Sequence, residues 1–331
     1  MERDPVSGLA FPTIADVWRA RAVVTQFLPP TPFIASAALD ERLGFHCRIK
    51  CENLQPIGAF KVRGGLTLMD VLTPEERARG VVSASTGNHG QSIAYAANIY
   101  GVAARVYMPE RANPLKVASM ERLGARVIGV GADFDACRLA AEADARETGA
   151  LYIEPANEPR LIAGVGTCAL EMLETDPELD AIFVPAGGGS GASAAGIVAG
   201  ALAPQAKVIA VGATGAPALY DGWRSGDLVA YERTETFAEG VATRVAASLP
   251  VALMRRHLHD FRLVSDAEMR RAILTLLETT RMLAEGAGAA ALAAAYAMRH
   301  ELAGRNVGVV LSGGNFTLES LAETLATEQP W

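Results

Sequence analysis

Short apolar runs alternate with longer amphipathic segments through most of the chain. The apolar runs are rich in Val and Ile and predict strands at 80–83, 104–108, 126–130, 180–184, 207–211 and 306–311. Between them, apolar residues recur at helical spacing. This pattern predicts helices at 91–100, 114–123 and 133–147, a helix that ends near residue 202, and a long helix after an N-cap at Ser265.

Alternating strands and helices predict an α/β fold, with parallel sheets covered by helices on both faces. Ligands of such sheets bind outside the carboxyl ends of the strands. Three glycine-rich segments of this chain directly follow predicted strands. The pattern therefore indicates a binding site at these strand ends.

Composition narrows the function classes. The chain has 331 residues and a formal net charge of −7, without a basic run, which argues against nucleic-acid and acidic-membrane partners. The four cysteines form no C-x-x-C pair, so we expect buried thiols in a reducing compartment rather than disulfides or a zinc site. The N-terminus lacks the apolar stretch of a signal peptide, and the uncharged stretch 181–206 is dominated by Ala and Gly. We expect a cytoplasmic protein.

Lys61 is the first candidate for chemistry. It lies between a Pro-Ile-Gly turn and the Arg-Gly-Gly at 63–65 that opens a helix. Lysine forms a Schiff base with an aldehyde cofactor when burial or a cationic neighbour lowers its pKa. A surface lysine on an amphipathic helix explains this segment alone equally well.

Three strand-to-helix or strand-end segments complete the set. Residues 83–90 (SASTGNHG) and 184–192 (VPAGGGSGA) place free N–H groups at helix starts, where carboxylates and phosphates bind. Residues 311–315 (LSGGN) place a serine hydroxyl at the end of the last strand. Ordinary turns explain the first and third segments taken singly. The second segment also contains G-x-G-x-x-A, a weak form of the motif by which dehydrogenases bind NAD. Such a site needs an acidic residue after the next strand to bind the ribose, and residues 211–213 contain none.

Taken together and in this order, the segments resemble the threonine/serine dehydratases and serine racemases. This is a β-elimination family of pyridoxal-phosphate (PLP) enzymes with the tryptophan-synthase-type fold, called fold type II. The resemblance runs from about Thr31 to Asn315 and includes residues 154–167, 236–241 and 285–288. It implies two parallel-sheet α/β domains with the cofactor in the cleft between them. Residues 1–54 and 158–331 would form the large PLP-binding domain and 55–157 the small domain.

The resemblance also assigns roles by position. Lys61 would carry PLP as a Schiff base and act as the Cα base, with Phe60 packing beside the cofactor. The substrate carboxylate would bind the loop of Ser85, Thr86, Gly87, Asn88 and His89, in which Asn88 also meets the phenolic oxygen of PLP. The phosphate of PLP would bind the loop of Gly187, Gly188, Gly189 and Ser190. Ser312 would meet the pyridine nitrogen, and Glu285 of the 285–288 segment would be a further cofactor contact.

The implied reaction is α,β-elimination of a serine- or threonine-like β-hydroxy amino acid to a 2-keto acid and ammonia. Because Thr86 stands where similar racemases carry the second acid/base, an amino-acid racemase using Lys61 and Thr86 on opposite faces is an alternative. A dehydratase for a bulkier substrate (3-hydroxyaspartate, phenylserine or a hydroxyectoine-derived amino acid), a β-replacement enzyme and a non-catalytic PLP-binding protein also stay open.

Several further expectations follow from the resemblance. The carboxylates that bind a divalent cation in some relatives are missing from 212–219, so no metal site is expected. The chain ends soon after Ser312, which predicts no C-terminal regulatory domain. A homodimer is expected, and some segment variants resemble dehydratases assigned to hydroxyectoine utilisation.

Overall fold

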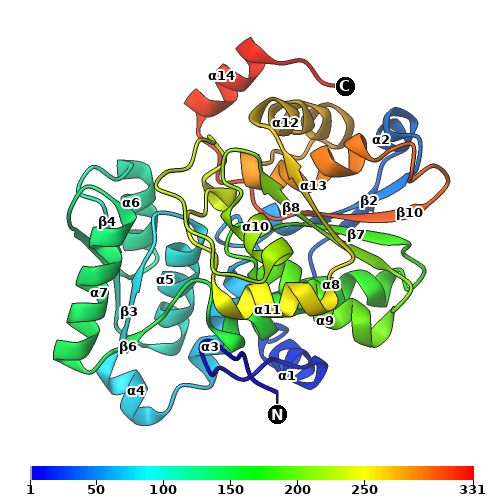
Figure 1. The fold of residues 1–331 in the computed structure, drawn as a ribbon. Helices are drawn as coiled ribbons and strands as arrows, with labels where there is room; N and C mark the ends of the chain where they lie inside the picture. Colours follow the sequence, from blue (N-terminus) through cyan, green and yellow to red (C-terminus); the bar gives the residue numbers. More distant parts are fainter. Residues whose placement is uncertain (1) are drawn as a thin grey trace.

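The chain forms two sheets, seen side by side in a computed structural model that describes residues 2–331 (Figure 1). The six-stranded sheet has the order β1-β2-β10-β7-β8-β9, and the four-stranded sheet has the order β5-β4-β3-β6. The strands are β1 (Phe33–Ala35), β2 (His46–Cys51), β3 (Val81–Ala84), β4 (Ala104–Met108), β5 (Arg126–Gly129), β6 (Leu151–Tyr152), β7 (Ala181–Pro185), β8 (Lys207–Ala213), β9 (Asp260–Val264) and β10 (Asn306–Leu311).

The prediction of parallel sheets is confirmed, with one exception. Every neighbouring pair of strands is parallel except β1 and β2, which pair antiparallel at the edge of the larger sheet. Because parallel strands share a carboxyl edge, the segments that follow β7 and β10 emerge on the same side of the large sheet.

Helices cover both faces of each sheet. They are α1 (Ile14–Val24), α2 (Ala37–Leu43), α3 (Val62–Asp70), α4 (Pro74–Arg79), α5 (Asn88–Tyr100), α6 (Pro114–Arg122), α7 (Phe134–Thr148), α8 (Pro159–Thr175), α9 (Ser190–Leu202), α10 (Ala218–Ser225), α11 (Ser248–His257), α12 (Asp266–Thr280), α13 (Gly286–Ala297) and α14 (Leu318–Thr327), with 3₁₀ turns η1 (Glu52–Leu54) and η2 (Glu239–Val241).

Helix caps explain where several of these helices begin. The predicted N-cap at Ser265 is confirmed: its hydroxyl accepts from the Glu268 N–H at 3.3 Å, and the Glu268 carboxylate accepts from the Ser265 N–H at 2.7 Å. α5 begins at Asn88, three residues before the predicted start. The apolar periodicity begins only at 91, whereas the first turn is held by the side chain of Ser85.

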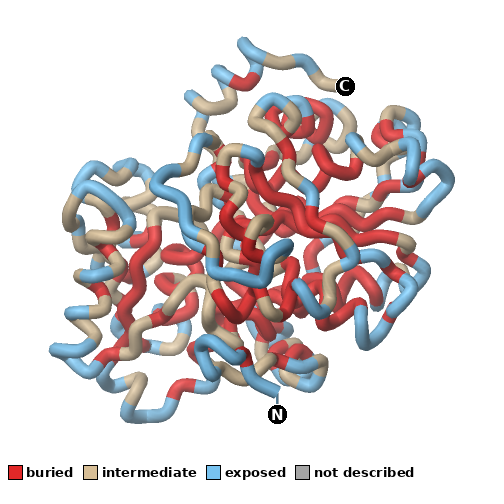
Figure 2. The backbone as a smooth tube through the Cα atoms, viewed as in Figure 1, coloured by how far each residue is buried: buried red, intermediate tan, exposed pale blue. Residues whose placement is uncertain are grey.

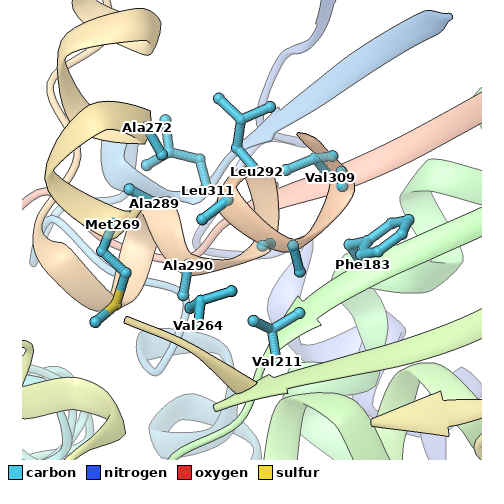
Figure 3. Close-up of a cluster of buried hydrophobic side chains, with 14 of the residues drawn as sticks. Phe183, Val211, Val264, Met269, Ala272, Ala289, Ala290, Leu292, Val309 and Leu311 are labelled. Carbon is cyan, nitrogen blue, oxygen red and sulfur yellow. The ribbon is translucent and has the colours of Figure 1, made fainter. Parts of the chain in front are cut away.

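α13 packs directly on the large sheet because it consists almost entirely of alanine. Its residues from Gly286 to Ala295 are all buried, and Leu292 is the only large side chain among them. Figure 3 shows Ala290 beside Val211 and Val264 of the sheet, and Ala289 beside Met269 and Ala272 of α12. Small side chains let a helix lie close to a sheet without gaps. The backbone tube in Figure 2 is coloured as buried through the centre of this layer.

The two sheets fall on the two sides of the predicted domain division. All strands of the small sheet lie between Val81 and Tyr152, and all strands of the large sheet lie outside 55–157. The division at 55 and 157 itself stays a prediction.

Candidate active site

Lys61 is held beside the carboxyl end of β10. The N–H of Phe60 donates to the carbonyl of Ser312 at 3.0 Å, and the N–H of Gly314 donates to the carbonyl of Gly58 at 2.9 Å. These bonds join the lysine segment to the segment after the last strand. They bring Lys61 and Ser312, which lie 251 positions apart in the sequence (312 − 61), to one place.

The Lys61 amine faces the start of α9. Its Nζ donates to the hydroxyl of Ser190 at 3.0 Å and lies 5.5 Å from the centre of the Phe60 ring. Burial lowers the pKa of Lys61 from 10.5 to about 8. A substantial part of this amine is therefore neutral near physiological pH, and a neutral amine is a nucleophile and a base.

The glycine loop between β7 and α9 presents its backbone to an anion. A side chain at Gly187 would place Cβ 2.1 Å from the carbonyl oxygen of Gly240, so only glycine fits there. Gly189 has φ +86, a left-handed conformation that glycine adopts freely. Within residues 2–331, the N–H groups of Gly188, Gly189 and Ser190 donate to no other group. Free N–H groups at a helix N-terminus form a phosphate cradle.

The loop between β3 and α5 is a second anion cradle, shaped by Ser85. Its hydroxyl accepts from the N–H of Gly87 at 3.3 Å and of Gly90 at 3.0 Å. The N–H groups of Thr86, Asn88 and His89 have no acceptor in the described part of the chain. The Ser85 side chain therefore shapes the loop, whereas three main-chain donors are left for a carboxylate.

The His89 ring is bonded inside the protein through Nε2, whereas its buried Nδ1 has no hydrogen-bond partner among the described residues. Its Nε2 lies 3.0 Å from the Ser83 hydroxyl, which itself donates to the carbonyl of Ile153 at 2.8 Å. Because that hydroxyl has one proton, Nε2 is the donor of the pair. Burial, followed by the charge of Lys61, lowers the pKa of His89 to about 3, so the ring is neutral. A substrate role for His89 stays a prediction, and its main-chain N–H is one group available for it.

Asn88 is fixed by two neighbours from the other side of the site. Its Nδ2 donates to Glu285 Oε1 at 2.7 Å, and its Oδ1 accepts from Asn315 Nδ2 at 2.6 Å. Asn315 also donates to the carbonyl of Ile57 at 2.9 Å, so its amide cannot turn around. Asn88 consequently has one N–H left to donate to a ligand, whereas its Oδ1 already accepts a hydrogen bond.

Glu285 lies at the N-cap of α13 and is partly buried. Burial raises its pKa from 4.5 to about 7, opposed by the hydrogen bond from Asn88. A substituent on Gly313 would place Cβ 2.4 Å from Glu285 Oε1, so the carboxylate packs on the backbone after β10. The sequence alone assigned Asn88 and Glu285 separately, and it did not indicate that Asn315 holds the other side of the Asn88 amide.

The same arrangement of elements occurs in known proteins. The family model described as "Pyridoxal-phosphate dependent enzyme" matches residues 24–313. The chain belongs to this family of PLP-dependent enzymes. This confirms the resemblance drawn from the sequence and the expected cofactor.

Individual relatives cover almost the whole chain. L-Threonine ammonia-lyase of Thermotoga maritima is 36% identical over 309 residues, which are 93% of this chain and 77% of the relative. L-threo-3-Hydroxyaspartate ammonia-lyase of Saccharomyces cerevisiae is 34% identical over 318 residues, 96% of this chain and 98% of the relative. The structure of maize serine racemase superposes with a TM-score of 0.89 at 29% identity, covering 96% of this chain and 99% of that one. The predicted α/β fold of fold type II is thereby confirmed.

The residues of the site fit PLP chemically. The glycine loop before α9 supplies free N–H groups for the phosphate, and Lys61 supplies an amine of lowered pKa for the aldehyde. Asn88 supplies a donor for an anionic oxygen, and Ser312, 5% exposed at the end of β10, supplies a neutral hydroxyl. Phe60 provides an apolar wall beside the amine.

The structure also bears on metal binding and on membrane insertion. Among residues 2–331, no three His, Cys, Asp or Glu side chains gather in a way that could hold a metal ion. None of the helices in this range is both long and apolar enough to cross a membrane. The four cysteines are buried and free, as the sequence predicts.

Proposed function

We propose that this PLP-dependent enzyme is an ammonia-lyase that removes the hydroxyl group from a small β-hydroxy amino acid. The Thermotoga and yeast relatives are named as ammonia-lyases and support this reaction type. The observation that carries the proposal is the Lys61 amine. Its pKa of about 8 and its place between the glycine loop and Ser312 suit both covalent attachment of the cofactor and proton transfer.

Different residues of this chain would bind the substrate and transfer its proton. PLP, when bound, supplies the electron sink for the charge left at Cα. The N–H groups of Thr86, Asn88 and His89 would hold the substrate carboxylate, and Lys61 Nζ would take the Cα proton. As the Cα–H bond breaks, its electron pair forms the new double bond and the Cβ–O bond breaks. The hydroxyl takes up a proton and leaves as water, and hydrolysis then gives a 2-keto acid and ammonia.

Ser312 would favour elimination over transamination. A neutral hydroxyl does not hold a neighbouring pyridine nitrogen protonated as a carboxylate would. PLP with an unprotonated pyridine nitrogen would withdraw electrons from Cα less strongly. The negative charge at Cα would then expel the β-hydroxyl before a proton adds to the cofactor. This role rests on the place of Ser312 at the end of β10, beside the Lys61 segment.

An amino-acid racemase is the second candidate, because Thr86 places a hydroxyl in the carboxylate loop. The chain's similarity to maize serine racemase favours considering it. Chiral analysis of the substrate left after partial conversion decides between the two. A racemase predicts inverted substrate from the wild type and none from Thr86→Ala, whereas a pure ammonia-lyase predicts none from either.

The finer assignments are proposals as well. The candidate substrates are serine, threonine, 3-hydroxyaspartate, phenylserine and a hydroxyectoine-derived amino acid. The similarity to the yeast hydroxyaspartate enzyme favours testing a substrate with a second carboxylate. We further propose a cytoplasmic homodimer, with residues 55–157 as the small domain.

A keto-acid assay across these substrates tests the function. The wild type should release equal amounts of keto acid and ammonia from at least one of them. Lys61→Ala should release neither, while Lys207→Ala, which removes an exposed lysine at the start of β8, should behave as the wild type. Borohydride treatment should fix the cofactor to the peptide that contains Lys61. A label on another lysine would refute the assignment.

A further inference from the structure

A group of four charged side chains lies buried next to the start of α3. Lys50, Glu52, Arg63 and Glu171 expose between 0% and 4% of their side chains. Arg63 follows Lys61 by two residues on the same helical turn. We call these four residues the Arg63 ion cluster.

Arg63 holds two carboxylates that come from different parts of the fold. Its Nε and Nη2 donate to Glu52 of η1 at 2.7 and 2.8 Å. Its Nη1 and Nη2 donate to Glu171 of α8 at 2.7 and 2.8 Å. Lys50 of β2 completes the cluster by donating to Glu171 at 2.5 Å. The more exposed Arg21 of α1 also lies 3.6 Å from Glu171 and pairs with Glu174 at 2.9 Å. The cluster joins β2, η1 and α8 to the first turn of α3.

Stability alone does not account for this cluster. Removing charges from water costs several kcal/mol for each ion, and apolar residues of similar volume often stabilise a protein as well or better. A planar guanidinium that binds two carboxylates, each through two hydrogen bonds, fixes the orientation of its own side chain relative to both partners. The Arg63 side chain has no exposed surface, so it cannot touch a substrate and can act only through its neighbours.

The helices around the cluster leave the first turn of α3 little freedom. A side chain at Gly164 of α8 would place Cβ 2.7 Å from both the Arg63 carbonyl oxygen and the Gly64 Cα, so the two helices touch backbone to backbone. Gly164, Thr167 and Glu171 share one face of α8, and Thr167 accepts from Arg63 Nη1 at 3.1 Å.

On the α5 side, Ser92 donates to the carbonyl of Lys61 at 2.6 Å. Lys61 has no side-chain cap of its own at the start of α3. The backbone of Lys61 is therefore fixed by α5 on one side and by the Arg63 ion cluster through the following turn.

We propose that the Arg63 ion cluster positions Lys61, setting the direction of the amine toward the glycine loop and Ser312. Arg63, Glu52 and Glu171 are thus positioning residues for covalent attachment of the cofactor and for proton transfer at Cα. The inference rests on the proposed function of Lys61. A displacement near 1 Å can lower a rate by about 100-fold, so the cluster should matter far more to kcat than to substrate binding.

Arg63→Lys tests the proposal because it keeps the charge and removes the planar fork. We expect kcat to fall by roughly 10- to 100-fold with KM changed by less than about threefold. PLP added to apoprotein should attach to Lys61 about tenfold more slowly, followed by the absorbance of the bound cofactor and by borohydride trapping of the Lys61 peptide. Arg270→Lys is the matched control, since Arg270 is also a buried helix arginine, and its side chain bonds Thr324 and Glu323 of α14 rather than the Lys61 segment.

A second variant covers the case in which Arg63→Lys does not fold. The double variant Glu52→Gln/Arg63→Gln removes one charge of each sign and leaves the Lys50–Glu171 pair. It should fold, and it should show the same slow attachment of PLP to Lys61. A folded variant of either kind with wild-type attachment rate and kcat overturns the inference. A wild-type chain that takes up no PLP refutes the proposed function, and this inference with it.

Discussion

The hydrogen bond between Lys61 and Ser190 allows a direct test of how the site tunes its amine. Ser190 is 2% exposed and accepts from Lys61 Nζ at 3.0 Å. A hydrogen bond to a charged group is worth about 1.5–3 kcal/mol, and one to a neutral group about half of that. The difference, about 1 kcal/mol, favours the protonated amine. Since one pKa unit corresponds to about 1.4 kcal/mol, Ser190→Ala should lower the pKa of Lys61 from about 8 by a little under one unit.

The pKa of this amine can be followed in the apoprotein. Only the neutral amine attacks an aldehyde, so the initial rate of PLP attachment rises with pH and reaches its midpoint at the pKa of Lys61. The midpoint should lie near 8 for the wild type and below it for Ser190→Ala. Ser193→Ala is the control, because Ser193 lies on the same helix and its hydroxyl bonds the Pro250 carbonyl instead. An unchanged midpoint in Ser190→Ala, or an equal shift in both variants, would refute the reasoning.

Two further predictions concern the other edge of the site. Ser312→Asp should raise transamination relative to elimination, because a carboxylate favours a protonated pyridine nitrogen; product analysis with an unchanged ratio would contradict this. For Glu285, the folded state keeps a proton that the unfolded chain loses between pH 4.5 and about 7, so its contribution to stability is full below 4.5 and lost as the pH rises through about 7. Glu285→Gln apoprotein should therefore gain stability over the wild type from about pH 5 to 8, by roughly 1–2 kcal/mol after allowance for partial exposure. Urea unfolding that shows no pH dependence of this difference would argue against it.

Much of the fold follows from local pattern. The strands that became β4 and β10 were predicted with the bounds observed, because buried parallel strands are continuous apolar runs between turns. The predicted start of α5 is three residues late, since its first turn is held by the hydrogen bond from the Gly90 N–H to the Ser85 hydroxyl rather than by an apolar repeat. β6 has only two residues, and so short a strand carries no recognisable periodicity.

The sequence predicted which segments form the site, but it did not predict which side chains of these segments contact each other. The glycine loop and Ser312 could be found because each directly follows a strand, and Lys61 because it lies between a Pro-Ile-Gly turn and an Arg-Gly-Gly that opens a helix. The pairing of Asn88 with Glu285, 197 residues apart, depends on how two sheets face each other. Arg63 could have been noticed as a charge inside an apolar helix face, but its partners Glu52 and Glu171 lie 11 and 108 residues away and could not.

The alanine-rich helix α13 packs both on the interior of the large sheet and on the backbone that follows Ser312. Its first residue follows Glu285, and a side chain at Gly288 would lie 2.2 Å from the Gly313 carbonyl oxygen. A methyl group added at Gly288 would therefore press on the backbone that directly follows Ser312. Natural variation in this core should be confined to paired exchanges that conserve volume, even at positions far from any ligand.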